Sequence, residues 1–195
     1  MEENKFYPVA NTEYPSLRFV VIGFGTMGKS CMLVRFFRKA FPEIYIPTVV
    51  DHDSQDVECE GKIYNVLGWD TSCAEDEWRG PLYYPQTDVY ILLNAVNQKD
   101  RLEEIESHWW PKLKLYDPDV SVILVGSKVD LRDKKSVSLK EGRQMAKKIG
   151  AACYMECSSK DDIGVTEVFE EAIKLSGENQ ATKKNKNNKC KCYLL

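Results

Sequence analysis

The residues with the clearest chemistry lie in one glycine-rich segment near the start of the chain. Residues 23–30 read Gly-Phe-Gly-Thr-Met-Gly-Lys-Ser, which fits the pattern G-x-x-x-x-G-K-[ST]. The glycines of this pattern let backbone N–H groups converge on phosphate oxygens, the lysine adds a positive charge, and the hydroxyl can bind Mg²⁺. The segment therefore predicts a phosphate site, without choosing between ATP and GTP. Its predicted contacts are Gly23, Gly25, Thr26, Met27, Gly28, Lys29, Ser30 and Cys31.

Two aspartates supply the next candidates, each at the end of an apolar segment. Asp70 closes the run 66–69, and a carboxylate at the end of a neighbouring strand can hold the Mg²⁺ of a phosphate site through water. Asp130 ends the segment Gly-Ser-Lys-Val-Asp at 126–130. Its carboxylate could accept hydrogen bonds from the N1–H and N2–H₂ groups of guanine, a pair that adenine does not offer. A helix N-cap or a turn is the alternative interpretation of Asp130.

The last residues of the chain form a third group. Residues 176–195 hold five lysines and one glutamate, although the whole chain has a net charge of −3. A short basic tail favours an anionic surface such as a membrane leaflet, and the acidic remainder argues against a nucleic-acid partner. Residues 192–195, Cys-Tyr-Leu-Leu, fit C-a-a-X, and the final leucine favours a geranylgeranyl group on Cys192. Cys190 is a candidate for a palmitoyl group.

Strands and helices alternate along the chain, which predicts an α/β sheet covered on both faces. The predicted strands are 17–22, 49–59, 62–69, 89–94, 121–125 and 152–156. The predicted helices are 28–37, 100–116, 138–150 and 165–175, the third opened by a capping box at Ser138. We expect a flexible extension at 1–16, one domain at 17–176, and a disordered tail at 177–195 because polar residues dominate there.

Composition narrows the class of protein further. The 195 residues are 43% hydrophobic and 29% charged, which is ordinary for a globular domain and excludes a mostly disordered or collagen-like chain. No apolar run reaches the length of a membrane span, and the first residues do not resemble a signal peptide. The seven cysteines contain no C-x-x-C pair, so we expect reduced thiols in the cytosol and no zinc site.

Several ordered segments together resemble the small GTPases of the Ras superfamily, and more closely its Rho/Rac branch. The resemblance covers about residues 17–175 and the last four residues. The segments that carry it are 23–30, 45–49, 69–71, 84–89, 110–111, 130–133, 156–159 and 192–195. It implies a P-loop NTPase fold with a mostly parallel six-stranded sheet and helices on both faces. It also implies GTP or GDP with Mg²⁺ as ligands.

The resemblance assigns roles to individual residues. Thr48 would be a second Mg²⁺ ligand whose amide meets the γ-phosphate, next to Ser30 as a direct ligand and Asp70 acting through water. Phe41 would stack edge-on against guanine, and Tyr45 would lie over the phosphates. The catalytic residues would be Lys29 and Thr48. Lys128 would pack along the base that Asp130 reads. The remaining implied nucleotide contacts are Cys73, Ser127, Leu131, Ser158, Ser159 and Lys160.

The chain departs from the family pattern in the two switch segments. The glycine and glutamine of the family's D-x-A-G-Q-E segment are replaced by Cys73 and Ala74. The glutamine orients the attacking water, so its loss predicts hydrolysis that is roughly 10–100-fold slower than in ordinary members. Val50 and Asp53 occupy positions where the family has aromatic effector contacts. Only residues 134–137 stand where Rho members carry an extra helix, and Ser127 replaces the usual Asn or Thr.

The sequence thus predicts a monomeric Rho-like switch at the cytoplasmic face of a cell membrane or endomembrane, with a cytosolic pool. Its expected partners are guanine nucleotide, effector proteins, an exchange factor and a dissociation inhibitor, and its expected role is in the actin cytoskeleton. A GTP-bound scaffold that does not hydrolyse is the main alternative. A P-loop kinase for a small molecule is a third, although the sequence shows no arginine-rich lid.

Overall fold

The computed structural model describes residues 13–42, 50–71, 86–119 and 121–190, and the side chains of these residues except 50, 51 and 178–190. Its centre is a six-stranded sheet in the order β2-β3-β1-β4-β5-β6. All neighbouring strands are parallel except β2 and β3. The strands are β1 (Ser16–Ile22), β2 (Val50–Cys59), β3 (Lys62–Thr71), β4 (Val89–Ala95), β5 (Ser121–Ser127) and β6 (Cys153–Glu156). The predicted α/β fold is confirmed.

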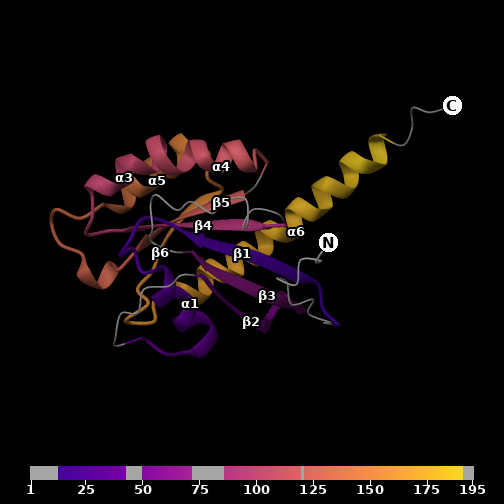
Figure 1. The fold of residues 1–195 in the computed structure, drawn as a ribbon, viewed down its shortest axis with the longest axis horizontal. Helices are drawn as coiled ribbons and strands as arrows, with labels where there is room; N and C mark the ends of the chain where they lie inside the picture. The colour runs from indigo at the N-terminus through magenta and orange to yellow at the C-terminus, as the bar shows by residue number, and fades with distance from the viewer. Residues whose placement is uncertain (1–12, 43–49, 72–85, 120, 191–195) are drawn as a thin grey trace, which may run out of the picture.

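Helices cover both faces of this sheet (Figure 1). On one face lie α1 (Lys29–Arg38) and α6 (Val165–Cys190). On the other lie α3 (Asp100–Glu104), the π-helical turn η1 (Ile105–Trp109), α4 (Trp110–Tyr116) and α5 (Leu139–Ile149). A short 3₁₀ turn, η2 (Val129–Leu131), follows β5. All seven residues of β4 and six of the seven in β1 are buried, as expected for central strands covered on both faces.

The hairpin of β2 and β3 turns at two residues with positive φ. Glu60 has a φ of 52° and Gly61 a φ of 74°, which is the backbone of a type I′ turn and matches the twist of the two strands. Further along β3, Gly68 leaves room for α1, because a Cβ there would lie 2.7 Å from Leu33 and 2.8 Å from Phe37. The absence of a side chain therefore lets α1 pack directly on the sheet.

Two expectations about the helices are corrected. The segment 100–116 is not one regular helix, because the π-helical turn η1 interrupts it. The tail was expected to be disordered from 177, yet α6 passes through Gly177 and continues to Cys190, away from the body of the domain (Figure 1). The residues after Gly177 include good helix formers and no proline, and one glycine costs a helix only about 1 kcal/mol. Within the described residues, no helix is both long enough and apolar enough to cross a bilayer.

Candidate nucleotide-binding site

The predicted site residues gather at the carboxyl ends of the parallel strands. The phosphate loop follows β1, Asp70 is the last residue but one of β3, and Asp130 follows β5. Residues 157–160 follow β6. In open α/β sheets this edge is where ligands bind. The topology thus brings together four segments that are far apart in the sequence.

The phosphate loop holds its shape through its backbone and one lysine. Gly23, Thr26 and Gly28 all have positive φ, at 144°, 63° and 91°. A Cβ on Gly23 would lie 2.6 Å from the carbonyl oxygen of Leu93, so only glycine fits there. The ammonium of Lys29 is buried and donates to the carbonyl oxygens of Gly23 (2.9 Å) and of Phe24 (3.0 Å). This curled backbone is the form that turns N–H groups toward an anion.

Oxygen donors for a magnesium ion lie next to this loop. The hydroxyl of Ser30, in the first turn of α1, donates to Oδ2 of Asp70 over 2.5 Å, and Asp70 is 4% exposed. A hydroxyl and a carboxylate are the hard oxygen ligands that Mg²⁺ prefers. Among the described residues there is no cluster of three or more His, Cys, Asp or Glu that could hold a metal by itself. The pair therefore fits a metal that takes most of its other ligands from phosphates and water.

The loops predicted to read the base are joined to each other. The hydroxyl of Ser158 donates to Oδ1 of Asp130 over 2.7 Å, and it accepts from the amide of Asp161 over 3.0 Å. The amide of Val129 donates to the carbonyl of Cys157 over 3.2 Å. These bonds hold the Asp130 carboxylate in place through Oδ1. Asp130 therefore stands as a positioned acceptor rather than as a helix cap.

The base loop and the phosphate loop are also connected. Ser127 is 3% exposed, and its hydroxyl donates to the carbonyl of Met27 over 2.7 Å. A Cβ on Gly28 would lie 3.6 Å from Cε of Lys128, so the lysine stem runs beside the phosphate loop. Lys128 itself has a φ of 59°. Ser127, which replaces the usual Asn or Thr, thus supplies a bond between the two loops.

Sequence reasoning missed an arginine that supports the site. Nε of Arg35 donates to the carbonyl of Ser159 over 2.7 Å, and NH2 donates to the carbonyl of Lys160 over 3.3 Å. Arg35 also lies 3.9 Å from Oδ1 of Asp162. It therefore ties α1, which begins at the phosphate loop, to the loop after β6. No motif in the sequence marks Arg35, because these two carbonyls are more than a hundred residues away in the sequence.

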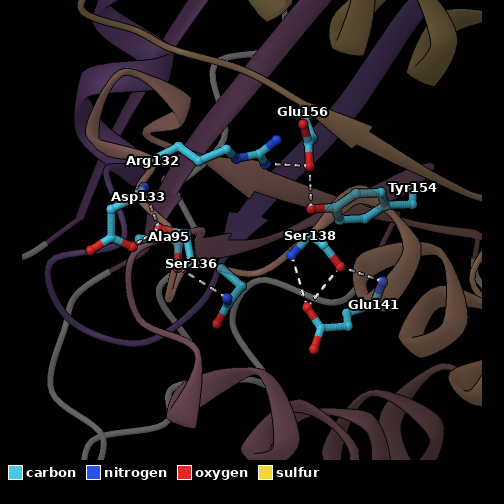
Figure 2. Close-up of polar contacts among 9 residues, drawn as sticks. Ala95, Arg132, Asp133, Ser136, Ser138, Glu141, Tyr154 and Glu156 are labelled. Carbon is cyan, nitrogen blue, oxygen red and sulfur yellow. Dashed lines mark hydrogen bonds and ion pairs between the residues drawn. The ribbon is translucent and has the colours of Figure 1, made fainter.

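A second missed set of contacts joins Arg132, Tyr154 and Glu156 (Figure 2). NH2 of Arg132 donates to Oε1 of Glu156 over 2.6 Å, and the hydroxyl of Tyr154 donates to the same oxygen over 3.0 Å. The bond to Glu156 raises the pKa of Arg132, and burial raises the pKa of Tyr154. Strand β6 and the residue that follows η2 are thereby joined.

The connection from Arg132 to α5 is compact (Figure 2). Asp133 accepts from the amide of Lys135 over 2.9 Å and from the hydroxyl of Ser136 over 2.8 Å, and these bonds lower its pKa. The predicted capping box is confirmed, with Ser138 and Glu141 each bonding the other's backbone. A bond from Lys99, followed by those from Ser138, lowers the pKa of Glu141 to about 2.

The two cysteines near the site are thiols at neutral pH. Burial raises the pKa of Cys31 and raises that of Cys157 to about 12. A nucleophilic or metal-binding cysteine needs a lowered pKa. Neither residue therefore fits covalent catalysis, and Cys31 can contact a nucleotide only through its backbone.

Three of the remaining predicted site residues differ in how far they are exposed. Phe41 is 38% exposed just beyond the end of α1, where an aromatic ring is open to a ligand. Leu131 is 48% exposed in η2, and Ser159 is buried. Tyr45, Thr48, Cys73, Ala74 and Cys192 lie outside the described residues, and Cys190 is the last residue of α6.

Comparison with known proteins agrees with this geometry. Residues 18–177 match the Ras family. The Ras-like GTP-binding protein RhoL of Drosophila melanogaster is 39% identical over 162 residues, which cover 81% of this chain and 85% of that protein. The chain therefore belongs to the Ras family of small GTPases, signalling switches that bind GTP or GDP with Mg²⁺ and hydrolyse GTP.

Proposed function

We propose that the chain is a Rho-like member of this family that hydrolyses GTP slowly and acts at a membrane. The similar fly protein is named RhoL, and the segments that resemble the Rho/Rac branch are spread over the whole domain. The observation that carries the slow hydrolysis is the pair Cys73 and Ala74, where the family has glycine and glutamine.

The residues that come just before this pair in the sequence support the proposal. The hydroxyl of Thr71, the last residue of β3, donates to the carbonyl of Val21 over 2.9 Å. Asp70 beside it holds the hydroxyl of Ser30. Ala74 is three residues further along the sequence. At that position the side chain has no polar atom that could orient a water molecule.

The phosphate loop does not need this pair in order to bind. Lys29 and the loop backbone meet the phosphates, and Ser30 with Asp70 holds the metal. Binding and hydrolysis therefore separate in this chain. We expect GTP to bind and the bond to the γ-phosphate to break roughly 10–100-fold more slowly than in a member with glutamine.

Single-turnover phosphate release from GTP-loaded protein tests this proposal. The A74Q variant restores the polar side chain and should raise the rate, and C73G/A74Q should raise it further. E75Q and Y45F serve as controls, because either side chain could replace the lost glutamine. A wild-type rate equal to that of an ordinary Rho protein would refute slow hydrolysis, and a fall in E75Q or Y45F would identify the substitute.

A scaffold that stays bound to GTP is the second candidate, and the same pair of substitutions favours it. Nucleotide extracted from freshly purified protein separates the two. Mostly GTP supports the scaffold, mostly GDP supports a slow but working switch, and an adenine nucleotide contradicts both.

The membrane role rests on the end of the chain. The proposed geranylgeranyl group on Cys192 gives reversible binding alone, and a second attraction is needed for a stable anchor. The five lysines of residues 176–195 could supply it on an anionic leaflet, at about 1 kcal/mol each before screening. Membrane fractionation of C192S tests the anchor, and C190S measures separately whether a palmitoyl group on Cys190 contributes. A C192S variant that stays fully on membranes would contradict it.

The partners of the switch are proposed from the resemblance. They are effectors of the actin cytoskeleton, an exchange factor and a dissociation inhibitor. Asp53, which stands where the family has an aromatic effector contact, forms an ion pair of 2.8 Å with Arg38 of α1. The effector set is therefore expected to differ from that of other Rho proteins. Calorimetry with purified Rho effector domains, on chain loaded with a non-hydrolysable GTP analogue or with GDP, measures this.

A further inference from the structure

The second residue of the phosphate loop is a buried phenylalanine. Phe24 is 2% exposed, and its ring packs on η1. The centre of the ring is 5.3 Å from that of His108, at an interplanar angle of 39°, and 5.7 Å from that of Trp109, edge to face at 70°. The guanidinium of Arg101 in α3 lies 4.8 Å from the same ring. A side chain of the phosphate loop is thus held by a helical turn that lies far from it in the sequence.

The partner of Phe24 is an unusual helical turn. Residues Ile105–Trp109 form a π-helix between α3 and α4. Such turns are rare and recur at functional sites. In η1 the adjacent residues His108 and Trp109 both contact the Phe24 ring, and their own ring centres are 5.5 Å apart. The π-helical turn therefore builds the aromatic pocket that receives the loop.

This pocket has its own support in α4. Nζ of Lys112 lies 2.9 Å from Nε2 of His108 and 6.0 Å from the centre of the Trp109 ring. On the loop side, the ammonium of Lys29 donates to the carbonyl of Phe24. The residue is held by its backbone through Lys29 and by its ring through η1.

We propose that Phe24 is a positioning residue that fixes the phosphate loop to η1, and that this contact sets how fast bound guanine nucleotide leaves. The loop contains three residues with positive φ. Ordering such a loop when the nucleotide binds would cost free energy and weaken the affinity for the nucleotide. An aromatic anchor orders it in advance. The inference rests on the guanine-nucleotide binding of the family and not on the rate of hydrolysis.

The test measures dissociation of a fluorescent GDP analogue from the full-length chain in Mg²⁺. F24A and H108A should each release the nucleotide roughly threefold to tenfold faster, the scale of one lost aromatic pair. F24L, which keeps most of the volume without the ring, should fall between F24A and wild type. The double variant F24A/H108A should be no faster than F24A, because both changes remove the same contact.

W110L is the matched control. Trp110 is the next aromatic residue of the same helical segment, but Lys114 and the region of Gly150 surround it instead of Phe24. It should lower thermal stability and leave the dissociation rate unchanged. Should F24A fail to fold, F24L and H108A decide the matter. The proposal is overturned if these variants release nucleotide at the wild-type rate, or if the two effects add fully in the double variant. Wild-type protein that binds no guanine nucleotide would instead refute the family function.

Discussion

Replacing Gly142 by alanine should destabilise this protein, although the same change usually stabilises a helix. Gly142 lies inside α5, where alanine is normally better by about 1 kcal/mol. A Cβ at this position would, however, lie 2.5 Å from Cε2 of Tyr154 and closer still to Cζ and Cε1. The ring of Tyr154 rests directly on the helix backbone, so the new methyl group has no space.

The Tyr154 ring cannot move aside easily. Its hydroxyl donates to Glu156, and a Cβ on Gly126 would lie 3.1 Å from its Cζ. The ring thus fills the space between two glycines. Overpacking of this kind costs about 1–3 kcal/mol. A ring fixed on both sides belongs in the upper half of that range, so the net loss in free energy of unfolding is about 1–2 kcal/mol after the helix preference is subtracted.

Thermal and urea unfolding of G142A measures this loss. A chain of this length should lose roughly 2–8 °C in melting temperature. G177A is the matched control, because Gly177 also lies within a helix but nothing is within 4 Å of its Cβ position, and it should be neutral or stabilising. The double variant G142A/Y154L should lose less than the sum of its parts. A G142A protein as stable as wild type would refute the reasoning.

Two further predictions concern single residues. D130N should weaken GDP binding by roughly 10–100-fold, which is the scale of hydrogen bonds to a charged group. The variant should also favour xanthosine diphosphate, because the C2 carbonyl of xanthine can accept a hydrogen bond from the new amide. Competition binding measures both effects. Burial holds the pKa of Cys157 at about 12, above its ordinary value of 9.0. The folded state therefore keeps a proton that the unfolded chain releases, and stability should fall as pH rises above about 9. The fall is at most about 1.4 kcal/mol per pH unit, and unfolding of C157A should show a shallower decline.

The parts of the structure that the sequence predicts are the local ones. The phosphate loop, the hairpin turn at Gly61 and the capping box at Ser138 each depend on residues within about eight positions of one another. The strands follow from apolar runs that central strands require. Asp70 and Asp130 each come at the end of a predicted strand. Because parallel strands end at the same edge of a sheet, the sequence also predicts that these two residues lie at one edge.

The parts that escape sequence reasoning depend on contacts between distant segments. Arg35 donates to two backbone carbonyls of the loop after β6, and carbonyls have no signature in a sequence. Phe24 looks like an unremarkable member of a glycine turn until η1 is built around it. The π-helical turn itself breaks a continuous helical pattern without any proline or glycine between residues 100 and 110.

The continuation of α6 to Cys190 changes the geometry expected at a lipid surface. A disordered tail would let the domain lie against the bilayer in many orientations. A helix over residues 177–190 instead adds a rod of about 20 Å at 1.5 Å per residue. With the proposed anchor at Cys192 and the four lysines of this segment drawn to the leaflet, the rod would restrict the directions in which the domain can leave the headgroups.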